Sequence, residues 1–110
     1  MRKTIQIDLD GVLNDYDGNF SEEIPKIKKG AKKFLKVLAK NYNVEIFTVR
    51  NKIATVKWLV SNKIDIFVKN VTNVKNPYSS IFLDDRAINF NGDFQDTLNK
   101  IKNFEPYWKR

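Results

Sequence analysis

The chain of 110 residues contains neither cysteine nor histidine. The lack of cysteine excludes a disulfide framework and a thiolate metal site. The lack of histidine excludes imidazole catalysis and histidine-bound zinc. Acid–base chemistry must therefore use carboxylates, lysine or tyrosine, and a bound metal is expected to be a hard, oxygen-binding ion such as Mg²⁺.

The sequence also lacks any apolar run long enough to span a bilayer. Basic residues follow Met1, but Asp8 and Asp10 interrupt the apolar stretch, so we expect mature sequence rather than a signal peptide. We therefore predict a cytoplasmic protein without a membrane partner. The length predicts a single domain over residues 1–110, too short to include a separate lid domain.

Acidic residues are fewer than basic ones, 13 against 20, and the net charge of +7 weakly favours an anionic partner. The lysines between Lys26 and Lys40 lie opposite an apolar stripe on a predicted helix. This stripe consists of Ile27, Ala31, Phe34, Leu35 and Leu38. Such a pattern is typical of a solvent-facing helix side, which we favour over a dedicated nucleic-acid patch.

Short apolar runs alternate with segments of helical spacing. The predicted strands cover residues 4–7, 44–48, 64–68 and 81–83. The predicted helices cover residues 30–40 and 51–61, with Asn51 as N-cap, and a last stretch capped by Asp93. The expected inward residues are Ile53, Val56, Leu59 and Val60 on the second helix and Phe94, Leu98 and Ile101 on the last. This alternation predicts an α/β fold, a Rossmann-like three-layer sandwich with a small, mostly parallel sheet, a minimal flap and no cap domain.

Polar residues follow three of the predicted strands at the point where each strand ends. They are Asp8 and Asp10, then Thr48 and Arg50, then Asp84 and Asp85. Because right-handed crossovers bring the carboxyl ends of parallel strands to one edge of the sheet, these side chains are expected to converge. Paired acids at such an edge indicate cation or proton chemistry.

These residues make nearly the whole chain similar to the haloacid dehalogenase superfamily of phosphatases, and to its small capless members in particular. Residues 8–12, Asp-Leu-Asp-Gly-Val, resemble the first motif of that superfamily, hhhDxDGx. Thr48 resembles the second motif, and residues 81–85 resemble the fourth, acidic motif. For the lysine of the third motif, Lys75 and Lys69 both fit by position. Lys75 is favoured because residues 72–77 are expected to form a loop that reaches inward.

The resemblance implies a role for each of these residues. Asp8 would attack phosphorus and form an aspartyl-phosphate, and Asp10 would act as general acid and base. Mg²⁺ would be bound by Asp8, by the backbone carbonyl of Asp10, by Asp84, and by Asp85 through water. Phosphoryl oxygens would be bound by Thr48 and by the lysine. Arg50 would bind a phosphate or carboxylate of the substrate, or pair with Asp85.

The expected function is Mg²⁺-dependent hydrolysis of a phosphomonoester on a small phosphorylated metabolite such as a sugar phosphate. The alternatives are a nucleotide or nucleic-acid end phosphatase and a non-catalytic binding or regulatory module of the same fold. Because a cap is missing, either the substrate is large or a homo-oligomer covers the site, and we favour the oligomer. The aromatic residues 106–108 are expected to dock on the domain or on another subunit.

Overall fold

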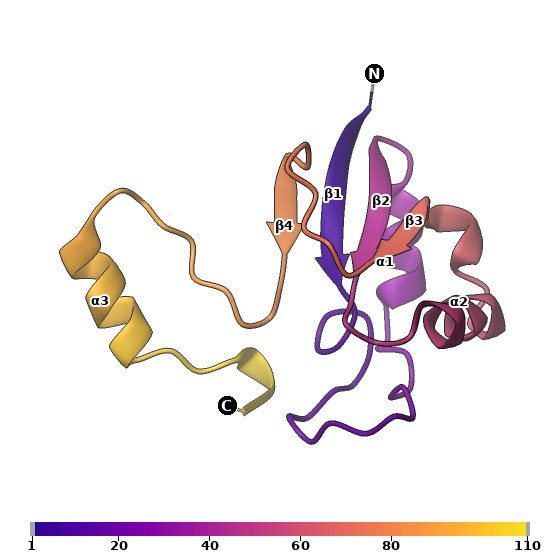
Figure 1. The fold of residues 1–110 in the computed structure, drawn as a ribbon, viewed down its shortest axis with the longest axis horizontal. Helices are drawn as coiled ribbons and strands as arrows, with labels where there is room; N and C mark the ends of the chain where they lie inside the picture. The colour runs from indigo at the N-terminus through magenta and orange to yellow at the C-terminus, as the bar shows by residue number, and fades with distance from the viewer. Residues whose placement is uncertain (1, 110) are drawn as a thin grey trace.

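The computed structural model describes residues 2–109, and within this range it has a four-stranded, fully parallel sheet in the order β3-β2-β1-β4 (Figure 1). The strands are β1 (Lys3–Asp8), β2 (Tyr42–Phe47), β3 (Asn70–Thr72) and β4 (Ile81–Leu83). The helices are α1 (Ala31–Leu38), α2 (Lys52–Ser61) and α3 (Phe94–Lys102), with short 3-10 turns at Asp65–Phe67 and Tyr107–Lys109. The predicted α/β class and parallel sheet are confirmed.

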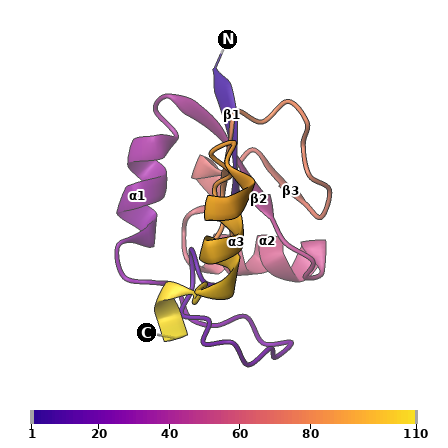
Figure 2. The ribbon, with the colours of Figure 1, turned by 90° about the vertical axis from the view of Figure 1, so that its left-hand side faces the viewer.

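The core lies around the two central strands, β1 and β2. Ile5 and Ile7 on β1 and Val44 and Ile46 on β2 are buried, and so is Gln6 between the two isoleucines. Helix α1 contacts β2 and contributes the fully buried Leu35, whereas α2 contacts β3. Figure 2 shows α1 and α2 on opposite sides of the sheet. Helices therefore cover both faces of the sheet, as the alternation of strands and helices predicts.

The predicted third strand at residues 64–68 is wrong. This segment forms the 3-10 turn Asp65–Phe67, and the strand follows it at Asn70–Thr72. Lys63 adopts a positive φ of 58°, which turns the chain after α2 and lets the Ile64 N–H donate to the Leu59 carbonyl at 3.0 Å. Ile64 is then fully buried. The apolar run is therefore used to seat one residue against the core rather than to extend the sheet.

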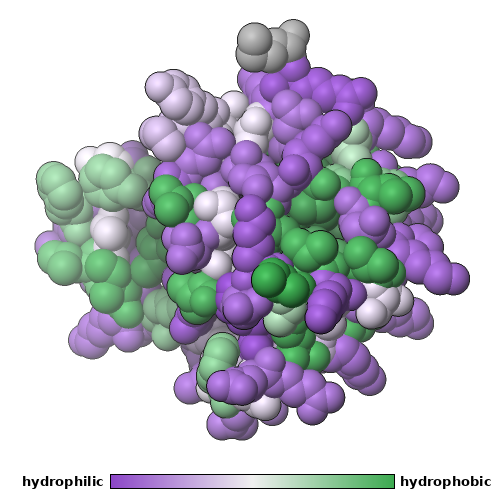
Figure 3. Space-filling view, turned by 45° about the vertical axis from the view of Figure 1, so that its right-hand side comes forward, coloured by the Kyte–Doolittle hydropathy of each residue, from purple (hydrophilic) through white to green (hydrophobic). Residues whose placement is uncertain are grey.

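The inward side of α2 also differs from the prediction. The Asn51 N-cap is confirmed, because its Oδ1 accepts a hydrogen bond from the Ala54 N–H at 3.0 Å. The buried side, however, consists of Thr55 and Leu59, beside the half-buried Trp58. The other three residues expected inside are exposed, namely Ile53, Val56 and Val60. Because α2 packs mainly on the short β3, only a narrow strip of the helix is covered, and apolar side chains lie among hydrophilic ones on the surface (Figure 3).

Helix α3 stands apart from the sheet, beyond the edge strand β4 (Figure 1). Its Asp93 N-cap is confirmed by hydrogen bonds from the N–H groups of Gln95 and Asp96. The residues predicted to face the core are exposed instead: Phe94, Leu98 and Ile101. Residues 84–93 lead away from the sheet before α3 begins, so the helical spacing is correct but the predicted packing is wrong.

None of the helices within residues 2–109 has both the length and the apolar character that a membrane span requires.

Candidate functional site

Three carboxylates meet at the carboxyl edge of the sheet, between β1 and β4. Asp8 is the last residue of β1, and Asp84 and Asp85 directly follow β4. Ile7 pairs with Leu83, and Asp8 and Asp84 are the next residues along the two chain segments. The chain order reverses here, because β2 and β3 lie on one side of β1 and β4 on the other. Ligands of open α/β sheets bind at such a point.

The three carboxylates are close enough to share one ligand. One side-chain oxygen from each of Asp8, Asp84 and Asp85 lies within 4.8 Å of the other two. Burial raises the pKa of Asp8 to about 8, helped by a hydrogen bond with Asp85 and by the negative charges of Asp84, Asp85 and Asp10. Asp8 thus keeps a proton at neutral pH when no cation balances the cluster.

The cluster fits a hard divalent cation. All its side-chain donors are carboxylate oxygens, the ligands that Mg²⁺ and Ca²⁺ prefer. Asp85 Oδ1 is buried, and no N–H or hydroxyl group within the described part of the chain donates to it. Buried polar atoms normally have a partner, so this oxygen is suited to bind a cation.

Asp10 lies beside the cluster but is held by other partners. Arg50 Nε donates to Asp10 Oδ2 at 2.8 Å, and Asn14 Nδ2 donates to Asp10 Oδ1 at 3.0 Å. The open alternative in which Arg50 pairs with Asp85 is therefore wrong, since the ion-pair partner is Asp10. Arg50 and Asn14 together fix the direction of the Asp10 carboxylate.

The guanidinium of Arg50 also connects the end of β2 to the loop that contains Phe20 and Ser21. Its side chain is only 4% exposed, and Nη1 donates to the Ser21 carbonyl at 2.7 Å. Phe20 lies against it, with the guanidinium carbon 4.5 Å from the ring centroid. The remaining nitrogen, Nη2, is buried without a hydrogen-bond partner among residues 2–109. Nη2 is thus the atom of Arg50 that is still available for the predicted contact with a phosphate.

Asn14 is a site residue that the sequence analysis missed. It is fully buried, and its Oδ1 accepts hydrogen bonds from the N–H groups of Gly11 and Tyr16 while Nδ2 holds Asp10. A side-chain amide four residues after Asp10 in a tight loop was the available signal, because asparagine often bonds nearby backbone in turns.

Lys75 and Lys69 lie at different places relative to the acids. Lys75 lines a hollow of about 200 Å³ together with Asp8 and Asp84, and its Nζ lies 4.6 Å from the centroid of the Phe82 ring. Lys69 precedes β3, at the opposite end of that strand from the acidic edge, and its N–H donates to the Val44 carbonyl. The geometry therefore favours Lys75, as the sequence analysis does.

Thr48 is buried at the same sheet edge, one residue beyond Phe47, the register partner of Asp8. Its Oγ1 accepts a hydrogen bond from the Arg50 N–H at 3.1 Å, which leaves the hydroxyl proton available to a ligand. Thr48 lines a separate hollow of about 360 Å³ with Arg50 and Thr72. The structure thus brings Thr48 to the predicted edge but not into the hollow of Asp8 and Lys75.

The C-terminal aromatic residues dock on this site, in agreement with one of the two expectations for them. Tyr107 Oη donates to the Gly11 carbonyl, and Trp108 Nε1 donates to Asp85 Oδ2. Gly11 has a φ of 86°, and a Cβ there would lie 2.1 Å from Asp85 Oδ2. Glycine is therefore required at this position both for its backbone conformation and for the close approach of Asp85.

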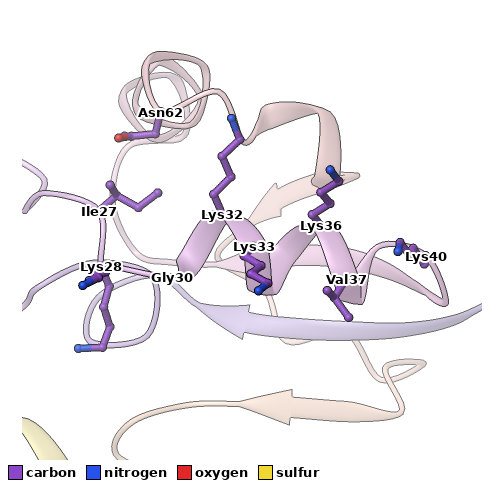
Figure 4. A pocket seen from close by; sticks show the side chains of 10 residues that line it. Ile27, Lys28, Gly30, Lys32, Lys33, Lys36, Val37, Lys40 and Asn62 are labelled. Atoms are coloured by element: carbon purple, nitrogen blue, oxygen red, sulfur yellow. The ribbon is translucent and has the colours of Figure 1, made fainter.

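A larger hollow, of about 790 Å³, lies along α1 and away from the acids (Figure 4). It is lined by six lysines: Lys28, Lys29, Lys32, Lys33, Lys36 and Lys40. The lysines of α1 are exposed, which confirms the predicted solvent-facing side. One of these lysines, Lys28, also contacts the C-terminal segment, because its Nζ lies 5.0 Å from the centroid of the Tyr107 ring.

Comparison of the chain with models of protein families, with curated proteins and with solved structures gives no match.

Proposed function

We propose that the chain is a Mg²⁺-dependent phosphomonoester hydrolase that acts through an aspartyl-phosphate on Asp8. The observation that carries the proposal is the cluster of Asp8, Asp84 and Asp85 at the point where the strand order reverses, with Lys75 lining the same hollow. The resemblance to capless haloacid dehalogenase phosphatases and a Rossmann-like interpretation of the parallel sheet support it.

Phosphoryl transfer needs a nucleophile that the negative phosphate does not repel. Mg²⁺ bound to the carboxylates supplies positive charge that offsets the charges of the nucleophile and the phosphoryl group. Asp8 then attacks phosphorus, and the bond from phosphorus to the leaving oxygen breaks as the aspartyl-phosphate forms. Lys75, which lines the same hollow as Asp8, would stabilise the phosphoryl oxygens.

Asp10 is the proposed acid and base of the two steps. It donates a proton to the leaving oxygen and then accepts one from the water that attacks the aspartyl-phosphate, which releases phosphate and restores Asp8. Arg50 and Asn14 hold both of its oxygens and so fix its direction. Positioning of this kind contributes strongly to catalysis, because small displacements of a catalytic group are costly.

The direct test is hydrolysis of an aryl phosphate by the purified chain. We expect phosphate release with Mg²⁺, loss of activity in EDTA, and recovery when Mg²⁺ is added back. Activity that persists in EDTA would contradict the metal roles of Asp84 and Asp85. No turnover despite bound Mg²⁺ would favour the alternative of a non-catalytic binding module.

The two lysines provide a matched pair of variants. Lys75→Gln is expected to lower kcat/KM for the aryl phosphate by about 100-fold, the usual cost of losing one charge-stabilising donor. Lys69→Gln, at the far end of β3, should remain within about twofold of the wild type. Steady-state kinetics of both variants measures this, and equal effects would remove Lys75 from the phosphate site.

A small phosphorylated metabolite is the first proposed substrate, and a nucleic-acid end is the second. The second is favoured by one observation, the lysine-lined hollow along α1, of which Lys28 also contacts the Tyr107 ring. Lysines along such a surface bind phosphate backbones without regard to sequence. A comparison of kcat/KM for sugar phosphates and for terminally phosphorylated oligonucleotides distinguishes the two.

A further inference from the structure

We propose that Trp108 is a positioning residue for the metal site and that residues 106–109 close one side of that site in place of a cap. The inference rests on the proposed function insofar as it takes the acidic cluster to bind Mg²⁺. The name "closing segment" is used below for residues 106–109.

The closing segment is anchored by specific contacts. Tyr107 Oη donates to the Gly11 carbonyl, one residue beyond Asp10, and Trp108 Nε1 donates to Asp85 Oδ2. The Trp108 ring meets Tyr16 edge to face, with centroids 5.4 Å apart. The segment thus bonds to both chain regions that form the acidic site, the loop after β1 and the turn after β4.

Two glycines provide the seat for Trp108. Gly18 has a φ of 98°, and a Cβ there would lie 2.8 Å from the Trp108 ring. A Cβ on Gly11 would lie 3.1 Å from Trp108 Nε1, as well as colliding with Asp85. At both positions the absence of a side chain leaves the space that Trp108 occupies. Trp108 is therefore packed closely against these two glycines and does not merely lie on the surface.

The contact of Trp108 determines which oxygen of Asp85 is available. The indole N–H donates to Oδ2, while Oδ1 is buried and accepts from no N–H or hydroxyl group of the described residues. A donor to one oxygen of a metal-binding carboxylate orients the other oxygen toward the cation, and such partners affect metal affinity strongly. Trp108 is therefore placed to fix the orientation of the Asp85 carboxylate beside Asp8 and Asp84.

Trp58, the other tryptophan of the chain, is a natural control. It is also half-buried, and its Nε1 also donates a hydrogen bond, but to the backbone carbonyl of Pro25. Replacement by phenylalanine keeps a ring and removes the N–H at either position. Only at Trp108 does that change take a donor from a carboxylate of the acidic cluster.

The first test measures Mg²⁺ affinity by calorimetry in protein that has been stripped of metal with EDTA and then freed of EDTA. Trp108→Phe is expected to weaken Mg²⁺ binding about tenfold, the lower end of the effect of such outer partners. Trp58→Phe should stay within about twofold of the wild type. Equal affinities of the two variants, or tighter binding by Trp108→Phe, would overturn the proposal, as would a wild type that binds no Mg²⁺.

The second test does not depend on how well Trp108→Phe folds. In Trp58→Phe, Trp108 is the one remaining tryptophan, so its emission reports on the contact with Asp85. MgCl₂ is expected to change this emission saturably, with the midpoint found by calorimetry, and Asp85→Asn in the same background should abolish the change. Emission that is unaffected by saturating Mg²⁺ would overturn the role of Trp108.

Failure of this inference is distinguishable from failure of the proposed function. Metal-dependent phosphatase activity with unchanged Mg²⁺ affinity in Trp108→Phe would remove only the positioning role. A Mg²⁺ response of Trp108 without phosphate release would remove only the phosphatase.

Discussion

Asp8→Asn is expected to lower kcat for aryl phosphate hydrolysis by at least about 10⁴-fold, with the fold retained. An amide oxygen is a poor nucleophile for phosphorus. The other two carboxylates of the cluster follow β4 rather than β1, so neither takes the position of Asp8. The sheet should tolerate the change, because asparagine has nearly the same volume and removes a carboxylate whose ionised form is disfavoured by burial. Single-turnover kinetics and circular dichroism measure the two effects.

Asp17→Asn is the matched control for this variant. Asp17 is exposed in the loop that follows β1, and its Oδ1 accepts a hydrogen bond from the Asn19 N–H, which an asparagine can also accept. Its activity should remain within about twofold of the wild type, as for most surface substitutions. Turnover by Asp8→Asn close to that of Asp17→Asn would contradict the assignment of the nucleophile.

In EDTA, the free energy of unfolding is expected to fall as the pH rises from about 5 to about 9. The pKa of Asp8 is about 8 in the folded chain, against 3.8 as the ordinary value, so between these values the folded state holds a proton that the unfolded state has lost. Stability falls with rising pH wherever the folded state binds more protons. The contribution of Asp8 is therefore present below about pH 4 and lost as the pH rises through about 8.

Mg²⁺ is expected to reverse this trend, because a cation on the three carboxylates replaces the proton and binds the folded state selectively. The rise in Tm on adding Mg²⁺ should be larger at pH 9 than at pH 6. Thermal melts with and without EDTA measure it. Asp8→Asn should be more stable than the wild type at pH 9 in EDTA and should lack its part of the slope. An identical pH slope in Asp8→Asn would contradict the raised pKa.

The convergence of the site was predictable because it follows from local patterns and one topological rule. Asp8 and Asp84 each end an apolar run, and parallel strands place such ends on one edge. The preference for Lys75 rests on the loop expected over residues 72–77, because both lysines follow the strand predicted at residues 64–68. Only the structure shows that Lys69 precedes β3. The features that follow directly from these local sequence patterns are thus found in the structure.

The remaining features depend on distant contacts that no local pattern encodes. The partner of Arg50 was not predictable, because a long guanidinium side chain reaches several carboxylates from one backbone position. The prediction of a strand at residues 64–68 was wrong because a short apolar run is equally consistent with a strand and with a turn that packs against the core. The apolar spacing of α3 predicts a covered face, yet Phe94 is 77% exposed, because spacing does not determine where the connection carries a helix.

The hydrogen bond from Tyr107 to Gly11 joins residues 96 positions apart, and its consequence concerns the order of events in folding. Contacts so distant in sequence close late, because a long loop must first be brought together at an entropic cost. On the ribosome, β1 and β2 can pair while the segment that holds Asp85 is still unsynthesised. A nascent chain can therefore pair β1 with β2 before its acidic cluster is complete, and the contact of Trp108 with Asp85 forms only after synthesis has passed residue 108.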